Sequence, residues 1–420
     1  MSELDETGMR RLLVYLAAAA VAGGQPVHEV ESDVRRLATR LGRPGIQVDA
    51  SPTGVVLSLG GGTPATFEAV EGTLRLDQSV DTYEIRSGLE HGTLAPEQAL
   101  ERLKALRRIP HRYPKAGLEL GMLCVATGIA LILQPTWPSV AFAAVAGQVT
   151  AAFIRLSGRW RSVATLTPFL AAFIIAFAAF GAAQLGLITN PIRSLLPPIA
   201  VLLPGALIVT GMAELAAGAM TAGTSRLVFG AGQLLLFALG VAGAAWLLDV
   251  PSYVLINELV NEIGPWSPFA GVLLLTAGIS LMESVPGRLV PWVAAMLSLT
   301  LAMQIYGQSV VGSPWFGALA GSTVASLGAA LIELYRPQLP RLVVFLPSFW
   351  LLVPGSLGVV SVTQLGLEPR LAGSTLLEAA SVMCSIALGL IIGTTVARMV
   401  GIARRRRHEL LRRRRHRRSR

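Results

Sequence analysis

The apolar and charged positions divide the chain into a short soluble part and a long apolar part. Residues 1–115 carry charge at the density of a soluble protein, whereas residues 117–400 carry very little. The apolar part contains ten runs of about 18 to 26 residues, each long enough to cross a bilayer as a helix. We therefore predict an α-helical polytopic membrane protein with a small N-terminal α+β domain. The runs are 117–134, 137–154, 163–187, 195–217, 226–248, 267–283, 289–306, 314–333, 341–361 and 374–399.

The spacing of apolar residues in the soluble part predicts a mixture of helices and strands. Residues 12–22 are apolar and predict a buried helix ending at Gly23-Gly24; the segment before them lacks the net positive charge of a signal peptide. Residues 27–41 repeat apolar positions at three- and four-residue steps, which indicates an amphipathic helix. The remaining expected elements are a hairpin over 46–59, a strand near 66–75, and helices at about 77–90 and 96–108.

One short stretch occurs twice at an offset of 150 residues. Residues 195–207 read LLPPIAVLLPGAL and residues 345–357 read FLPSFWLLVPGSL, so that Pro204-Gly205 matches Pro354-Gly355. Proline removes a backbone donor and disrupts a helix, and in lipid the freed backbone groups must face protein or a water-filled cavity. Paired breaks in two halves of a chain indicate a transporter binding site. The alternative for each break is a structural kink.

The repeat matches the fourth run to the ninth, so each half contains five runs. Because five is an odd number, the second half enters the membrane upside down, as in transporters built from inverted repeats. We predict a soluble cytoplasmic domain over 1–115, membrane repeats over 116–250 and 251–402, and an Arg-rich cytoplasmic tail over 403–420. Gene duplication without transport is the alternative.

The charge distribution predicts the orientation in the membrane. Residues 404–420 hold 11 Arg and one Glu, and account for the whole net charge of +10. A basic tail after a final span is typical of the cytoplasmic side and of contact with anionic lipid headgroups, and we predict no nucleic-acid partner. We expect a bacterial cytoplasmic-membrane protein with both termini inside. The predicted inner loops hold Arg155, Arg159, Arg161, Arg226, Arg288, Arg336 and Arg341, and the outer loops hold Arg193 and Arg370.

Polar residues near the two breaks are candidates for binding substrate and protons. Glu378 lies inside the last run, where an uncompensated carboxylate costs about 3 kcal/mol, and we predict that Glu378 and Glu214 couple transport to protons. Glu214, Glu283 and Glu333 lie near predicted cytoplasmic ends, where a solvated side chain is the favoured interpretation and a role in transport is the alternative. Arg226 begins the fifth run and is either a ligand for a substrate carboxylate or a topology anchor. The predicted substrate-binding residues are Pro204, Gly205, Thr210, Ser225, Arg226, Pro354, Gly355, Ser356 and Ser361.

The sequence gives little support for catalysis or for metal or nucleotide binding. We predict no enzyme activity, metal or cofactor, because no nucleophile motif, metal-ligand spacing or Gly-x-x-x-x-Gly-Lys loop is present. Cys124 and Cys384 both lie in apolar runs and do not suggest a disulfide.

Several short segments resemble the bacterial threonine/serine exporter family. In the soluble part they are Ala22–Gly24, His28–Glu31 and Gly88–Leu94; in the membrane part they are the repeated Leu-Pro-Gly stretch and Thr221–Leu227. The resemblance covers nearly the whole chain. It implies efflux of threonine and serine driven by an ion gradient, and it carries over no individual site residue.

Our leading hypothesis is a secondary active exporter of small hydroxylated amino acids, coupled to the proton gradient or the membrane potential. Its expected partners are the amino acid, protons and membrane lipids, and a homo-oligomer is an open alternative. We expect the soluble domain to pack on the inner loops and to gate transport. The competing hypotheses are a membrane-anchored sensor or enzyme that does not transport, and an exporter of another small solute such as dipeptides.

Overall fold

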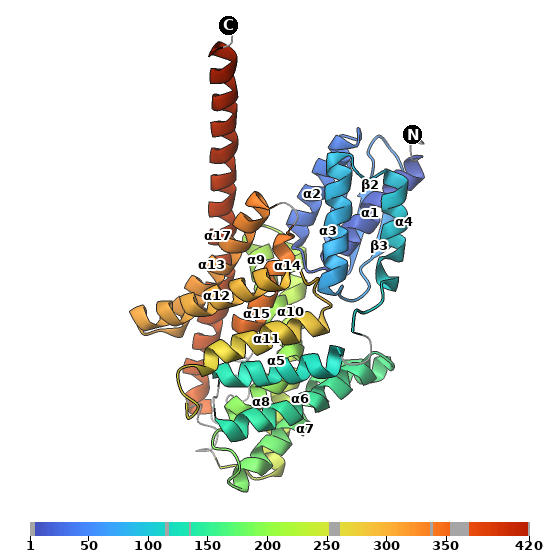
Figure 1. Ribbon diagram of the computed structural model, residues 1–420. Coiled ribbons are helices and arrows are strands. Elements are labelled where there is room, and N and C mark those ends of the chain that lie inside the picture. The colour runs from blue at the N-terminus through green and yellow to red at the C-terminus, as the bar shows by residue number, and fades with distance from the viewer. Residues whose placement is uncertain are drawn as a thin grey trace.

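The computed structural model describes residues 5–113, 117–133, 136–251, 261–336, 339–352 and 369–418. Its N-terminal domain lies at one end of a larger all-helical part, beside the C-terminal half of the last helix (Figure 1). The boundary between the two parts falls where the sequence changes from charged to apolar.

The N-terminal domain packs four helices around a three-stranded antiparallel sheet of order β1-β2-β3. The long apolar run forms the central helix α1, whose residues Leu12, Leu13 and Leu16 are almost completely buried, and the Asp5 side chain caps its amino end. Every helix and strand expected in this domain is confirmed. They are α1 (Glu6–Ala22), α2 (Val27–Arg40), β1 (Gln47–Ser51), β2 (Gly54–Ser58), β3 (Thr66–Ala69), α3 (Leu76–His91), α4 (Pro96–Ala105) and the 3-10 turn η1 (Leu106–Arg108).

The helical part follows the sequence repeat closely. Residues 117–247 form α5 (Gly117–Leu133), α6 (Trp137–Ser157), α7 (Arg161–Gln184), α8 (Pro191–Ile199), η2 (Ala200–Leu202), α9 (Gly205–Ala216) and α10 (Met220–Leu247). The later residues form α11 (Ser267–Met282), α12 (Val290–Val311), α13 (Pro314–Tyr335), α14 (Arg341–Phe345), α15 (Pro347–Leu352) and α17 (Pro369–Arg418). We refer to the first group as the first half and to the second group as the second half.

The helix lengths identify a multi-pass membrane protein. Among the described residues, six helices are long and apolar enough to cross a membrane, and the bent pair α8–η2 and α9 makes a seventh candidate. Three further apolar segments are shorter: α5, α11 and α14–α15. At 17 and 16 residues, α5 and α11 are about 26 Å and about 24 Å long, less than a typical hydrocarbon core. Ten spans therefore stay a prediction.

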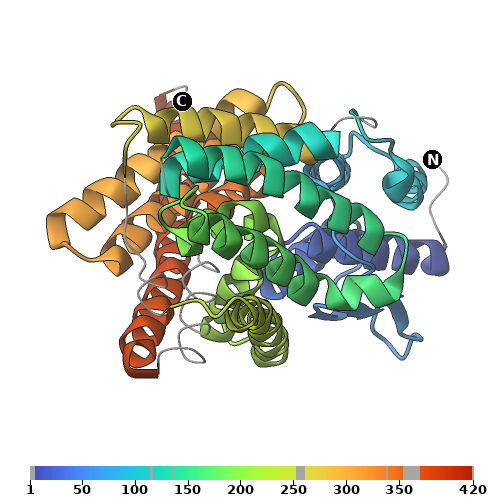
Figure 2. The ribbon, with the colours of Figure 1, turned by 90° about the horizontal axis from the view of Figure 1, so that it is seen from below.

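Glycines bring α5 and α11 into direct backbone contact at two places. A Cβ atom on Gly121 would lie 3.0 Å from the carbonyl oxygen of Gly278, and one on Gly128 would lie 2.7 Å from that of Gly271. In the 150-residue repeat, Gly121 corresponds to Gly271 and Gly128 corresponds to Gly278. The contact of Gly121 with Gly278 is therefore equivalent to the contact of Gly271 with Gly128. The helices cross antiparallel, and Figures 1 and 2 both show teal α5 beside yellow α11.

A second pair of equivalent contacts joins the long helices of each half. In the first half, a Cβ on Gly240 of α10 would lie 2.5 Å from the carbonyl oxygen of Phe169 in α7. In the second half, one on Gly389 of α17 would lie 2.8 Å from the carbonyl oxygen of Leu319 in α13. Leu319 is Phe169 moved by 150, and Gly389 lies one residue before the position that matches Gly240. The two halves therefore share packing as well as sequence.

The last helix continues far beyond its apolar section. Residues 376–402 are the apolar section, and the helix runs on through the Arg-rich tail to Arg418, projecting past the other helices (Figure 1). The predicted tail is therefore helical in this structure.

The cysteines are free, with Cys124 half-buried and Cys384 exposed.

Candidate functional site

The predicted helix break is present in the first half. The axis turns by 65° between Pro191–Leu202 and Gly205–Ala216. Leu203 is extended at this point, and Pro204 precedes the first residue of α9 without a side-chain cap. Pro204 and Gly205 are both buried. The first N–H groups of α9 therefore lack helical acceptors at a buried position, as the sequence predicted.

Helices of both halves surround this break. Pro197 and Pro198 lie inside α8, which packs against α6 and α7 of its own half. On the other side, Val209 of α9 belongs to an apolar cluster with Leu352 of α15 and Val382 of α17. The half-buried Thr210 follows Val209. The break thus lies where the first half meets the second, with mostly apolar side chains around it.

The matching break of the second half lies outside the described residues. Pro354, Gly355, Ser356 and Ser361 all belong to this segment. The described chain before it contains α14 and α15, which meet at Leu346 and together correspond in position to α8.

Glu214 and Arg226 form a buried ion pair at the far end of α9. Arg226 Nε lies 3.0 Å from Glu214 Oε2, and the two side chains are 10% and 0% exposed. Arg226 lies in the second turn of α10 rather than at its start, because this helix begins at Met220. Glu214 is therefore not a solvated residue. Nine residues of helix, about 14 Å, separate it from Gly205.

A backbone N–H group of the N-terminal domain also binds the carboxylate of Glu214. The backbone N–H of Val27 donates to Glu214 Oε1 at 3.0 Å. Val27 is the first residue of α2, whose N-cap position is Pro26 and has no capping side chain. Glu214 therefore caps a helix of the N-terminal domain, where the helix dipole favours a negative charge.

The structure assigns different surroundings to Ser225 and Glu378. Ser225 is exposed on α10, and its hydroxyl donates to the backbone carbonyl of Thr221 at 2.7 Å. Glu378 is exposed two residues after the apolar section of α17 begins. Neither side chain reaches the break in the described part of the chain.

A second glutamate caps another helix of the N-terminal domain. Glu283 lies one residue beyond α11, and its Oε2 accepts the backbone N–H of Leu76, the first residue of α3, at 3.3 Å. Its backbone carbonyl accepts the N–H of Asp77, also at 3.3 Å. Burial raises the pKa of Glu283 to about 7, and the nearby Asp77 adds to this shift, while the Leu76 N–H and Arg75 oppose it.

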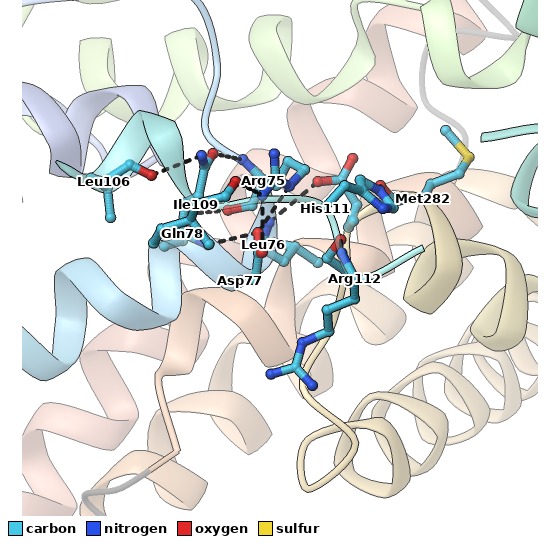
Figure 3. Close-up of polar contacts among 12 residues, drawn as sticks. Arg75, Leu76, Asp77, Gln78, Leu106, Ile109, His111, Arg112 and Met282 are labelled. Atoms are coloured by element: carbon cyan, nitrogen blue, oxygen red, sulfur yellow. Dashed lines mark hydrogen bonds and ion pairs between the residues drawn. The ribbon is translucent and has the colours of Figure 1, made fainter. Parts of the chain in front are cut away.

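The segment after η1 completes this contact (Figure 3). The His111 ring donates from Nε2 to the carbonyl oxygen of Met282 at 2.9 Å, and the Arg112 N–H donates to Ser284 Oγ at 3.3 Å. Arg75 pairs with Asp77 and donates to the carbonyl oxygen of Ile109 at 2.9 Å. These bonds hold the amino end of α3 against the end of α11.

Further ion pairs tie the N-terminal domain to the second half. Arg341 pairs with Glu29, Arg288 pairs with Glu84, and Arg86 lies 3.9 Å from Glu333. Two of these arginines, Arg288 and Arg341, come from the predicted inner loops. The N-terminal domain therefore contacts two of the predicted inner loops, and the side of the membrane on which it lies stays a prediction.

A cavity of about 820 Å³ lies between the N-terminal domain and the second half. Helices α1, α2 and α3 form one wall, and α13, α14 and α17 form the other. The cavity is lined by charges of both signs, since its walls include Glu29, Asp33, Arg36, Arg86, Glu333, Arg341 and Arg398.

The structure also contains buried hydroxyl groups that sequence reasoning missed. Ser194 Oγ lies 2.9 Å from Ser139 Oγ, which also receives a hydrogen bond from Thr136 at 2.8 Å. In the second half, the buried Thr300 and Ser348 hydroxyls lie 3.5 Å apart. Serine and threonine are common in membrane helices, so nothing in their spacing distinguished these residues. In the part of the chain that the structure describes, no cluster of His, Cys, Asp or Glu could hold a metal ion.

The comparisons with known proteins agree with this arrangement. Residues 11–248, more than half of the chain, match the family model of the putative threonine/serine exporters. The chain belongs to the threonine/serine exporter family. A probable threonine/serine exporter of Mycobacterium tuberculosis (strain ATCC 25618 / H37Rv) is 25% identical over 422 residues, which cover 94% of this chain and 78% of the relative. No solved structure matches. This exporter family membership and the apolar helices together describe a multi-pass membrane transporter rather than an enzyme.

Proposed function

We propose that this exporter moves threonine and serine out of the cytoplasm as a secondary transporter coupled to the proton gradient or the membrane potential. Membership of the family supports export, and the name of the mycobacterial relative supports the substrate class. The location proposed is the cytoplasmic membrane of a bacterium, with both termini inside. The basic tail and the arginines near the N-terminal domain support that orientation.

The observation that carries the proposal is the 65° break before Gly205, between the two halves. The N–H groups at the amino end of α9 lack helical acceptors, and they would attract a carboxylate. Thr210, about one and a half turns further along α9, is proposed to meet the hydroxyl of the substrate. The repeated sequence supports an equivalent role for Pro354, Gly355, Ser356 and Ser361 in the second half, where backbone carbonyls would hold the ammonium group.

The geometry of α5 and α11 supports inverted halves. Two helices related by a two-fold axis that is parallel to them run in the same direction. Two helices related by an axis perpendicular to them run in opposite directions. The exchanged contacts Gly121–Gly278 and Gly128–Gly271 are antiparallel, which favours the second case. For spanning helices that axis lies in the membrane plane, and alternating access then follows from rocking one half against the other.

We assign proton coupling to Glu378 rather than to Glu214. The carboxylate of Glu214 is held by Arg226 and by the N–H of Val27, so gaining a proton would leave the guanidinium unpaired in a buried position. Glu378 is exposed and has no such charged partner among the described residues.

The test is efflux of labelled threonine and serine from proteoliposomes. Wild-type protein should export both, and Gly205→Leu should abolish export by filling the break. The matched control is Gly232→Leu, because Gly232 has open space around it in α10. Dissipating the pH gradient and the potential separately identifies the driving force. Wild-type efflux rates in the Gly205→Leu variant would exclude this site.

A further inference from the structure

We propose that the cavity between the N-terminal domain and the second half binds a free amino acid as a zwitterion, at a site separate from the helix break. This inference rests on the proposed function, because it takes the cytoplasmic cargo as the ligand. The site would sense the cargo before it is transported.

The size and location of the cavity fit a small ligand. Its volume of about 820 Å³ is within the range of about 300–1,000 Å³ found for small-molecule sites. It lies between the N-terminal domain and the helical part, and interfaces between domains are a common place for such sites. Apolar side chains, including Leu16 and Val34 from one wall and Leu342 from the other, complete the lining.

The charges indicate a ligand that carries both signs. Asp33 accepts from Arg36 and Arg86 on its own wall, and Glu29 pairs with Arg341 across the cavity. An α-amino acid has a carboxylate for the arginines and an ammonium group for the acids. These acids and arginines already pair with one another. A zwitterion can join them through both of its charges, whereas a simple anion or cation would meet only one of the two sets.

Two side chains of the lining have unused binding capacity. Nδ1 of His28 is buried and has no hydrogen-bond partner among the described residues. Arg398 of α17 lines the same cavity and has no ion-pair partner in the described part of the chain. For His28 Nδ1, a buried polar atom without a partner is costly, and a bound carboxylate or ammonium group would provide one. Arg398 is exposed at the cavity and could pair with a carboxylate there.

Binding here would couple cargo concentration to the position of the N-terminal domain. Because the walls belong to different parts of the protein, a ligand that contacts both stabilises their association by mass action. Since Glu214 joins the same N-terminal domain to α9, the ligand would also act on the helix that follows the break.

The experiment measures threonine binding to the full-length protein in nanodiscs by calorimetry. Gly205→Leu, with the break filled, should still bind threonine. Adding His28→Ala or Arg398→Gln to that variant should weaken binding at least tenfold. The control is Arg43→Gln, because the Arg43 side chain is 42% exposed and lies outside the cavity lining. Threoninol, which lacks the carboxylate, and N-acetylthreonine, which lacks the ammonium group, should both bind at least tenfold more weakly.

The possible results separate this inference from the proposed function. Loss of all threonine binding in Gly205→Leu would overturn the inference. Binding of threoninol or of N-acetylthreonine as tight as that of threonine would also overturn it. Displacement of threonine by inorganic phosphate alone would also overturn it, because it would indicate a simple anion site. Retained binding in Gly205→Leu together with no efflux by the wild-type protein would leave the inference standing and remove the proposed function.

Discussion

The carboxylate of Glu214 accepts a hydrogen bond from the backbone N–H of Val27, 187 residues earlier in the chain, at 3.0 Å. This single contact joins the segment after the helix break to the first turn of a helix in the N-terminal domain. Arg226 holds the other carboxylate oxygen.

Replacing Glu214 by Ala should loosen the N-terminal domain. The substitution removes the cap of α2 and leaves the Arg226 guanidinium buried without a partner, so the expected destabilisation is about 3–5 kcal/mol. Hydrogen exchange at residues 27–30 should accelerate, and thermal unfolding should begin earlier. Glu31→Ala, on the same domain but outside this contact, serves as the control. Unchanged exchange at Val27 in the Glu214→Ala protein would contradict the assignment.

Reversing the charges of Glu29 and Arg341 should show whether their ion pair holds the domain. Glu29→Arg and Arg341→Glu should each weaken docking, since each places like charges together in a half-buried site. The double variant should recover much of the loss, and a double-mutant cycle on thermal stability gives the coupling energy. The matched comparison is Glu31 with Arg35, a pair within α2. Additive effects at Glu29 and Arg341 would mean that the pair contributes nothing.

Docking should depend on pH through Glu283. Its pKa in the docked state is raised to about 7 from an ordinary value of 4.5, mainly by burial. Docking therefore favours the protonated carboxyl group of Glu283. The stabilisation of the docked state by this proton is complete below about pH 4.5, and it is lost as the pH rises through 7. Protection of residues 76–80 from hydrogen exchange should fall between pH 5 and pH 8. Glu283→Gln should remove this dependence, and an equal pH response in that variant would exclude Glu283 as its cause.

The crossing of α5 and α11 should not tolerate a side chain. Gly128→Ala would place a Cβ atom 2.7 Å from the Gly271 carbonyl oxygen, so the expected cost is about 1–3 kcal/mol of overpacking. The control is Gly232→Ala, since no atom lies within 4 Å of a Cβ at that position. Thermal unfolding in detergent measures the difference. Equal melting temperatures would show that the helices separate easily.

The sequence predicted those features that depend on neighbouring residues. Pro204-Gly205 disrupts a helix through its own backbone chemistry, and the apolar spacing of residues 27–41 produces an amphipathic helix in most surroundings. The partners of Glu214 and Glu283 could not be predicted in this way, because a carboxylate near the end of a span looks the same whether water or a helix terminus meets it. The glycines of α5 and α11 also carried no signal, since their role depends on a helix about 150 residues away.

The attachment of the N-terminal domain has a mechanical consequence. It holds the first half through Glu214 and the second half through Glu283, Arg288, Glu333 and Arg341. A rigid body fastened at two points fixes the distance between them. If the halves rock against one another, that distance changes, and the N-terminal domain must lose its contacts with one half. If the proposed rocking occurs, the contacts to one half have to break before each transport cycle.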